Sequence, residues 1–302
     1  MPLNLPVELS EYHERLAEWF DHNARSLPWR EADCSPWGVM VSEFMLQQTP
    51  VVRVLPRWYE WLERWPTPAD LAAEPAGEAI RAWGRLGYPR RALRLHAAAT
   101  TIATEYANEV PRTEEELLAL PGVGAYTAAA IASFAYDVPT TVIDTNIRRV
   151  HARAFAGMAL PEPSLTKAER ERAELVKPTD PELANQWNAA TMELGALVCT
   201  ARKPACDACP LLDICAWQLT GCPEPHYTPK GHPWHGTDRQ LRGALVQTLR
   251  EEHGCLPVTE LLGAVDFAWA DHDRKVQCLN GLVADGLVEL TGENLERAQL
   301  PS

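Results

Sequence analysis

The stretch LPGVGAYTAAAI, Leu120–Ile131, predicts two helices joined by a tight turn. We expect the first helix to end before Pro121 and the second to begin near Ala125. Gly122 and Gly124 give the backbone the freedom that the turn needs. Such a turn presents free backbone N–H groups beside a helix N-terminus, and this arrangement binds phosphate without net positive charge. Glycines also occur in ordinary helical turns, so the stretch alone leaves both interpretations open.

The sequence on either side of this hairpin also has a helical pattern. Apolar residues recur three or four positions apart, as at Tyr12 and Leu16, and no alternating strand pattern occurs in residues 8–220. Helix-start signals precede two segments: a Ser-Pro pair at Ser35–Pro36 and a capping box at Thr113–Glu116. The sequence therefore predicts an all-α fold for this region.

The C-terminal third has a different composition. Residues 221–237 are rich in Pro, Gly and His and are expected to form a linker. Residues 238–302 contain three helical segments and a two-strand ribbon that turns at Gly292–Asn294. The predicted organisation is a helical core, 1–220, followed by the linker and a small winged-helix-like domain.

The net charge and the local distribution of charge lead to opposite predictions about a nucleic-acid partner. The 302-residue chain has a formal net charge of −13, which taken alone argues against a nucleic-acid partner. Arg81–His96 nevertheless carries five arginines and no acid, whereas residues 238–302 hold 11 acidic and six basic residues. Further basic side chains lie at Arg148, Arg149, Arg153, Arg202 and Lys203. A single basic run is usually a solvated helix face, but several that flank one candidate site favour DNA.

Two carboxyl groups are candidates for catalysis. Asp144 follows the apolar run Val142–Ile143 and is expected to cap the next helix, whose N-terminus favours a charged carboxylate. Glu43 has mostly apolar neighbours on its helical face, so we expect it to be buried with a raised pKa. A protonated acid and a charged carboxylate together suit the cleavage of an acetal-like bond, such as the N-glycosidic bond to a base. Taken singly, Asp144 is a plain N-cap and Glu43 a residue on a solvated flank.

Four of the eight cysteines lie in the stretch Cys199–Cys215, with the spacing C-x6-C-x2-C-x5-C. The chain begins without a signal-peptide pattern, and no apolar run approaches the length of a membrane span. We therefore expect a reducing, cytoplasmic setting, in which disulfides are disfavoured. Zinc sites typically use two C-x2-C pairs, and only one is present. Four thiolates in a compact loop also suit an iron–sulfur cluster, so the spacing leaves zinc and the cluster open.

Six motifs occur in order along the chain: LPWR, SEFMLQQT, WGRLGY, LPGVGAYTAAAI, IDTNIRRV and MELGALVC, the last running into the cysteine spacing. Over about residues 10–220 the chain resembles the helix-hairpin-helix DNA glycosylase superfamily, and most closely the MutY-type adenine DNA glycosylases. The resemblance implies a two-lobed fold and a structural [4Fe–4S] cluster held by Cys199, Cys206, Cys209 and Cys215. The cluster would stiffen its loop so that Arg202 and Lys203 contact DNA phosphate.

The resemblance also implies catalytic roles. Glu43 matches the acid that protonates adenine and then helps to activate water. Asp144 matches the carboxylate that stabilises the oxocarbenium ion, and Asn146 would orient the site. Tyr126 falls where the related endonuclease III carries its Schiff-base lysine, so strand cleavage through an imine is not expected.

Contacts to DNA and to the base follow from the same resemblance. Gln48 and Tyr88 match residues that wedge into the duplex while adenine flips out, and Thr49 of the same motif is assigned to DNA binding. Trp29 and Leu46 would line the base pocket.

The chain departs from the family pattern in two places. Relatives carry Gln or Glu ten residues before the first cluster cysteine, where this chain has Ala189; Asn188 would have to compensate in reading adenine. Most relatives end in a Nudix-like domain that checks for 8-oxoguanine, and residues 238–302 are too short for one. Recognition of 8-oxoguanine would then fall to the linker and the winged-helix-like domain.

The expected protein is a monomeric, monofunctional adenine DNA glycosylase that acts on A·8-oxoG or A·G mispairs in double-stranded DNA. We expect it in the cytoplasm, associated with the nucleoid and not with a membrane. Two alternatives stay open: a mismatch uracil or thymine glycosylase of the same fold, which Ala189 favours, and a DNA-binding or redox module that keeps the cluster without catalysis.

Overall fold

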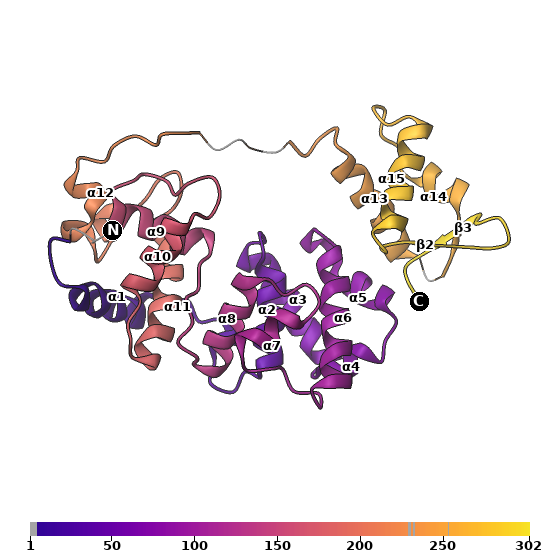
Figure 1. The fold of residues 1–302 in the computed structure, drawn as a ribbon. Coiled ribbons are helices and arrows are strands. Elements are labelled where there is room, and N and C mark those ends of the chain that lie inside the picture. The colour runs from indigo at the N-terminus through magenta and orange to yellow at the C-terminus, as the bar shows by residue number, and fades with distance from the viewer. Residues whose placement is uncertain (1–4, 229–230, 232, 253) are drawn as a thin grey trace. The chain divides into compact units, whose positions relative to one another are not determined.

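The computed structural model describes residues 5–228, 231, 233–252 and 254–302 (Figure 1). Their contacts divide the chain into two units. The first unit takes the described residues of Met1–Pro36, Arg112–Leu117 and Gly124–Lys230, and the second those of Trp37–Pro111, Leu118–Val123 and Gly231–Ser302. No described helix is both long and apolar enough to cross a membrane.

The first unit is helical, and residues of α1, α9 and α11 form its hydrophobic core. Tyr12 and Leu16 of α1 are fully buried against Val150 and Phe155 of α9 and Trp187 of α11. The helical elements are α1 (Leu9–Asn23), η1 (Pro28–Arg30), α8 (Ala125–Tyr136), α9 (Thr145–Ala156), α10 (Lys167–Val176), α11 (Pro181–Leu197), η3 (Cys206–Ala208), η4 (Leu212–Ile214) and α12 (Ala216–Leu219).

The helices of the second unit surround a core rich in tryptophan. Trp61 meets Trp65 and Trp83 edge to face, with ring centroids 4.7 and 5.7 Å apart. Such pairs add to the free energy of burial, because the positive ring edge faces the negative ring face. The elements are α2 (Pro36–Leu46), α3 (Val51–Arg64), α4 (Pro68–Ala72), α5 (Ala76–Trp83), η2 (Gly84–Leu86) and α6 (Arg90–Glu105).

The predicted hairpin is present between α7 (Glu114–Ala119) and α8. Gly122 has a φ of +78°, and a Cβ there would lie 2.5 Å from Cβ of Arg94, so only glycine fits. Gly124 lies in extended backbone with open space around it. The turn therefore requires glycine at the first position only, although the sequence analysis assigned the same role to both.

The described residues 231–302 form a small C-terminal module within the second unit. It contains α13 (Asp238–Glu251), β1 (Leu256–Pro257), α14 (Val258–Ala264), α15 (His272–Ala284), β2 (Glu289–Thr291) and β3 (Arg297–Gln299). The strands make an antiparallel sheet in the order β1-β3-β2. The expected three helices and ribbon are confirmed; the two-residue β1 was missed, because so short a strand has no periodicity to detect.

The C-terminal module packs against α5 of the same unit. The backbone N–H of Gly77 donates to the carbonyl of Pro301 at 2.7 Å, and a Cβ on Gly77 would lie 2.5 Å from that oxygen. At the other end of the contact, Arg81 donates to carbonyls at the end of α13, among them that of Glu252 at 2.9 Å. Glycine at position 77 is therefore needed for the close approach of the chain end.

Candidate active site

Glu43 lies on α2, a helix that is apolar on all sides. Residues 37–45 are all buried, and Glu43 itself is 5% exposed. The expectation of a buried acid is confirmed, and the alternative of a solvated flank is wrong. Burying a carboxyl costs free energy, and buried acids are common at active sites, so the position of Glu43 is compatible with a chemical role.

Asp144 caps α9, as the sequence predicted. Its Oδ1 accepts a hydrogen bond from the backbone N–H of Ile147 at 2.6 Å, and its Oδ2 accepts one from the Asn146 amide at 2.8 Å. Burial raises the pKa of the Asp144 carboxyl, while these hydrogen bonds and the positive charge of Arg149 oppose that rise. The helix N-terminus that we expected to favour the charged form is thus outweighed by desolvation.

Asn146 connects this carboxylate to the cysteine loop. Its Oδ1 accepts a hydrogen bond from Arg149 at 2.9 Å, and Arg149 also donates to the carbonyls of Gly195 at 2.6 Å and Cys199 at 2.7 Å. A Cβ on Gly195 would lie 2.7 Å from Cβ of Asn146, so glycine lets α11 approach α9 closely. The amide of Asn146 is therefore held from both sides and cannot rotate freely.

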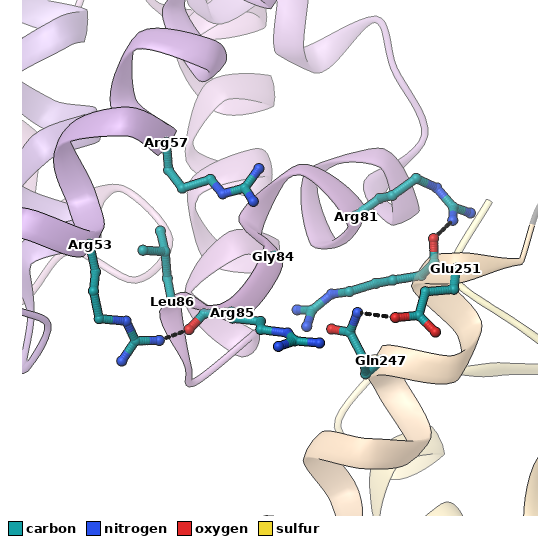
Figure 2. Close-up of a pocket in the computed structure, with 9 residues that line it drawn as sticks. Arg53, Arg57, Arg81, Gly84, Arg85, Leu86, Gln247 and Glu251 are labelled. Atoms are coloured by element: carbon teal, nitrogen blue, oxygen red, sulfur yellow. Dashed lines mark hydrogen bonds between the residues drawn. The ribbon is translucent and has the colours of Figure 1, made fainter. Parts of the chain in front are cut away.

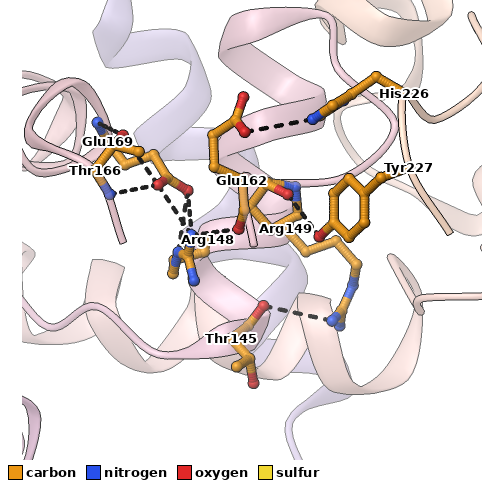
Figure 3. A network of polar contacts seen from close by, with 9 residues as sticks. Thr145, Arg148, Arg149, Glu162, Thr166, Glu169, His226 and Tyr227 are labelled. Carbon is orange, nitrogen blue, oxygen red and sulfur yellow. Dashed lines mark hydrogen bonds and ion pairs between the residues drawn. The ribbon is translucent and has the colours of Figure 1, made fainter. Parts of the chain in front are cut away.

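The neighbouring arginines are also structural (Figure 3). Arg148 makes hydrogen bonds of 2.8 to 3.0 Å with both carboxyl oxygens of the buried Glu169, which itself caps α10 through Thr166. Arg153 is 4% exposed and donates to the carbonyls of Ala159 and Thr200. The basic run in α9 thus holds the first unit together and does not present a charged face to DNA.

Tyr126 lies in the first turn of α8, next to the Asp144 cap. Its half-buried ring packs against a cluster that contains Val142 and Ile147, the residue whose N–H Asp144 accepts. The structure thus brings Tyr126, Asp144 and Asn146 to one region of the first unit, whereas Glu43 belongs to the second.

The expected base-pocket residues have contrasting environments. Trp29 of η1 is 7% exposed and Leu46, the last residue of α2, is half-buried. Asn188 is 3% exposed, and its amide nitrogen donates to Ser133 Oγ at 3.1 Å and to the Thr140 carbonyl at 3.0 Å. With both N–H groups used internally, Asn188 has only its carbonyl oxygen left for a base.

Two arginines on either side of Trp29 in the sequence pair with a buried glutamate, which sequence reasoning did not predict. Arg25 and Arg30 both bond to the fully buried carboxylate of Glu193, at distances from 2.7 to 3.0 Å. Burial alone would raise the pKa of Glu193, but the hydrogen bonds from the two arginines lower it to about 2. The LPWR and MELG motifs are thus physical partners. No spacing rule pairs residues so far apart in the chain.

The two expected wedge residues, Gln48 and Tyr88, lie in the second unit on two separate turns. Both have left-handed backbone, with φ of 55° and 48°, which is rare for residues with a Cβ and common at functional sites. Both side chains are exposed, and Thr49 is buried between the turns, where its hydroxyl donates to the Leu86 carbonyl at 3.2 Å.

Arg91, which sequence reasoning did not single out, holds these two turns together. One guanidinium nitrogen donates to carbonyls of the first turn, including that of Gln47 at 2.6 Å. The other donates to Thr49 Oγ1 at 3.0 Å and to the carbonyls of Leu86 and Gly87 in the second turn. Burial lowers the pKa of Arg91 to about 10, so the group stays charged at neutral pH. One buried cation therefore fixes both turns.

The four clustered cysteines line one small cavity in the first unit, together with Arg153 and Trp217. Among the described residues, no three His, Cys, Asp or Glu side chains are close enough to hold a single metal ion. A cubane cluster separates its four thiolates more widely than one zinc ion does, so this cage fits a cluster better. Burial raises the pKa of the Cys209 thiol to about 12, and bound iron would supply the positive charge that a thiolate needs there.

Arg202, Lys203, Gly122 and Gly124 are all exposed. Arg202 and Lys203 lie in the loop between the first two cluster cysteines, where Thr200 Oγ1 closes a turn onto the Lys203 carbonyl at 2.7 Å. Their exposure is what a contact to DNA phosphate requires.

Comparison with known proteins gives the family. A model of the HhH-GPD superfamily of base excision DNA repair proteins matches residues 41–178, and the iron–sulfur binding domain of endonuclease III matches residues 199–215. An adenine DNA glycosylase of Mycolicibacterium smegmatis is 48% identical over 279 residues, 92% of each chain. The chain belongs to the adenine DNA glycosylase family. The human adenine DNA glycosylase is 40% identical over 69% of this chain and 40% of its own length.

Solved structures agree on the fold. A thermostable thymine-DNA glycosylase superposes with a TM-score of 0.63 at 26% identity, covering 70% of this chain and 97% of that one. An endonuclease III bound to DNA gives 0.59 at 24% identity, covering 71% and 98%. The predicted helix-hairpin-helix glycosylase fold is confirmed.

As an adenine DNA glycosylase, the protein is a hydrolase of N-glycosyl bonds that acts in base excision repair, and DNA is its partner. It binds a [4Fe–4S] cluster through the cysteine loop, which sets aside the zinc and disulfide alternatives. The uracil, thymine and non-catalytic alternatives are likewise set aside. The 279 residues aligned with the mycobacterial relative exceed the 220 of the predicted core, so that relative shares part of the C-terminal region.

Proposed function

We propose that this adenine DNA glycosylase removes adenine paired with 8-oxoguanine or guanine in double-stranded DNA. Adenine is an undamaged base, so an enzyme that excises it must take its selectivity from the base opposite. The observation that carries the proposal is the pair of turns at Gln48 and Tyr88, which Arg91 fixes as one rigid, exposed wedge. A rigid wedge enters the duplex at one base-pair step, and its entry depends on how readily the bases of that step unstack.

The C-terminal module reaches this wedge. Arg239 of α13 donates to the Tyr88 hydroxyl at 3.0 Å and lies over the rings of both Tyr88 and Trp234, 5.5 and 4.9 Å from their centroids. These residues are where we place the reading of 8-oxoguanine. We also propose that the predicted core, 1–220, carries the chemistry and 238–302 the recognition.

The chemistry follows from the two carboxyl groups. Glu43 donates its proton to a ring nitrogen of adenine, the C1′–N9 bond breaks, and its electron pair leaves with the base. Asp144 stabilises the positive charge left on the sugar, with Asn146 fixing its orientation. Water then adds at C1′ and returns a proton to the Glu43 carboxylate. We assign contacts with the flipped base to Trp29, Leu46 and the Asn188 oxygen.

In this proposal the enzyme is a monofunctional glycosylase because Tyr126 occupies the position of the Schiff-base lysine. A phenol at that position cannot form an imine with the opened sugar, so the product is an intact abasic site. Backbone N–H groups at Gly122 and Gly124, with Arg202 and Lys203, hold the phosphates. The enzyme works as a monomer in the cytoplasm, on the nucleoid.

Single-turnover excision from four duplexes, holding A·8-oxoG, A·G, U·G or T·G, tests the proposal. The rate constant should be largest for A·8-oxoG, smaller for A·G and at background for uracil and thymine. Equal rates for adenine opposite 8-oxoguanine and opposite thymine would contradict it.

A further inference from the structure

An arginine-lined groove lies between η2 and α13, both in the second unit (Figure 2). Five guanidinium groups reach it from three parts of the chain, Arg53, Arg57, Arg81, Arg85 and Arg250. Its volume is about 350 Å³. So many cations in one place are unexpected in a chain whose formal net charge is −13.

Backbone carbonyls accept hydrogen bonds from several of these arginines, which fixes the orientation of the side chains without neutralising their charge. Arg53 donates to the Arg85 carbonyl, Arg250 to the Ile80 carbonyl at 2.9 Å, and Arg81 to the Glu252 carbonyl at 2.9 Å. A carbonyl carries only a partial charge, so the groove keeps most of its positive potential.

The carboxylates nearby are too few to balance the groove. Glu60 pairs with Arg57, and Glu78 is shared between Arg81 and Arg64. Glu251 accepts from the Gln247 amide at 2.7 Å. Arg85 is exposed and forms no ion pair among the described residues.

Arg250 lies in the positive field of its neighbours. Burial, and then the positive charges of Arg57 and Arg81, lower its pKa to about 10. Like charges held together in the free protein are relieved when an anion binds, because the anion replaces repulsion by attraction.

The groove continues toward the wedge. A second hollow of about 760 Å³ shares Arg53, Arg85 and Arg250 with it and extends to Gln48 and Tyr88. A path of positive charge therefore begins where the duplex would be opened and runs along α13. A free anion would use one small site, whereas this elongated path suits a chain of phosphates.

We propose that the arginine groove binds the phosphodiester backbone of the duplex next to the wedge, with Arg250 of the C-terminal module as one of its five cations. The inference rests on the proposed function only in that it places the duplex at Gln48 and Tyr88.

The test compares the full-length holoenzyme with the double variant Arg57→Gln/Arg85→Gln. Within the part of the chain that the structure describes, these two side chains donate to no backbone carbonyl, so we expect their loss to leave the fold intact. The matched control, Lys167→Gln/Arg170→Gln, removes the same charge from exposed positions on α10. Affinity for an undamaged duplex is measured by fluorescence anisotropy over a range of salt concentrations, with cluster absorbance as the check on folding.

The logarithm of the association constant falls as the logarithm of the salt concentration rises. We expect this dependence to be shallower by about 2 in the groove variant, since each phosphate contact contributes about 0.9 to the slope. Its Kd should rise roughly 10- to 100-fold at low salt, while the single-turnover excision rate at saturating enzyme stays unchanged. The control should match the wild type except for a small, uniform loss. A groove variant with the slope and Kd of the control overturns the proposal.

Two further measurements distinguish a free anion as the ligand, and a failure of the proposed mispair, from a failure of the groove proposal. If inorganic tripolyphosphate protects the wild type against unfolding at submillimolar concentration while duplex affinity is equal in all variants, a free anion is the ligand and the proposal is wrong. If the wild type fails to excise adenine opposite 8-oxoguanine, the proposed mispair fails, but the salt slope on undamaged DNA still decides the groove.

Discussion

Arg149 donates one hydrogen bond to the Asn146 side-chain oxygen, at 2.9 Å, and another to the Cys199 carbonyl, at 2.7 Å. Asn146 in turn donates to Asp144 at 2.8 Å. The backbone of the first cluster ligand is thus two hydrogen-bonded side chains away from the carboxylate proposed to stabilise the sugar cation. We infer that these hydrogen bonds connect the cluster loop to the chemistry without electron transfer.

Replacing Arg149 by Met should therefore reduce both stability and activity. The change removes the Arg149 donor from the buried carbonyl of Gly195 and from the half-buried carbonyl of Cys199, which costs about 2–3 kcal/mol. Thermal denaturation measures the first effect and single-turnover excision the second. Arg170→Met, at an exposed position on α10, is the control; a full-rate Arg149→Met enzyme would show that the bridge has no part in catalysis.

Glu43→Gln should abolish base release and leave duplex binding nearly unchanged. The amide has the size of the acid but cannot protonate adenine, and loss of a general acid typically costs 10²- to 10⁴-fold in rate. Excision under single turnover and anisotropy binding, measured on the same duplex, separate the two effects. A rate near that of the wild type would rule out Glu43 as the acid.

The pH dependence of excision should report Asp144. Its folded-state pKa is raised by burial, so the charged form needed for catalysis is lost as pH falls through that raised value. Stability has the opposite sign, because a raised carboxyl pKa favours the fold at low pH and this contribution disappears as pH rises. Asp144→Asn should thus be inactive yet at least as stable as the wild type at neutral pH. A variant clearly less stable there would contradict the assigned direction.

Glu193 should dominate acid denaturation of the first unit. Its pKa of about 2 lies below the ordinary glutamate value of 4.5, so the carboxylate contributes about 3 kcal/mol of stability at neutral pH. That contribution is present above the unfolded value and is lost as pH falls from about 4.5 toward 2. Denaturant titrations at several pH values should show this loss in the wild type and not in Glu193→Gln, which should be destabilised already at pH 7. Parallel pH curves would disprove the assignment.

Tyr126 permits a gain-of-function test. Wild-type product should break only after alkali, and borohydride should trap no covalent complex with DNA. Tyr126→Lys places an amine in the first turn of α8 and should begin to trap and nick. Tyr126→Phe is the matched control and should do neither. Efficient trapping by the wild type would be incompatible with a monofunctional enzyme.

The sequence by itself determined the features that depend on short range. The hairpin between α7 and α8, the Asp144 cap and the C-terminal helices were predicted, because each follows from hydrogen bonds within about four residues or from a periodic apolar face. The spacing of the four clustered cysteines also lies within a short stretch, and it limited the predicted metal site to zinc or an iron–sulfur cluster. Recognition of the ordered motifs then gave the family.

Only the tertiary structure decided which polar groups meet. Arg91 joins the turns of Gln48 and Tyr88, Glu193 joins Arg25 to Arg30, and the arginines of α9 are buried where the sequence suggested a surface. A side chain's partner and burial depend on contacts between residues far apart in the chain, such as Arg25 and Glu193, which are 168 positions apart. Periodicity and spacing carry no information at that range, because the free energy of a buried charge is set by the whole surrounding fold.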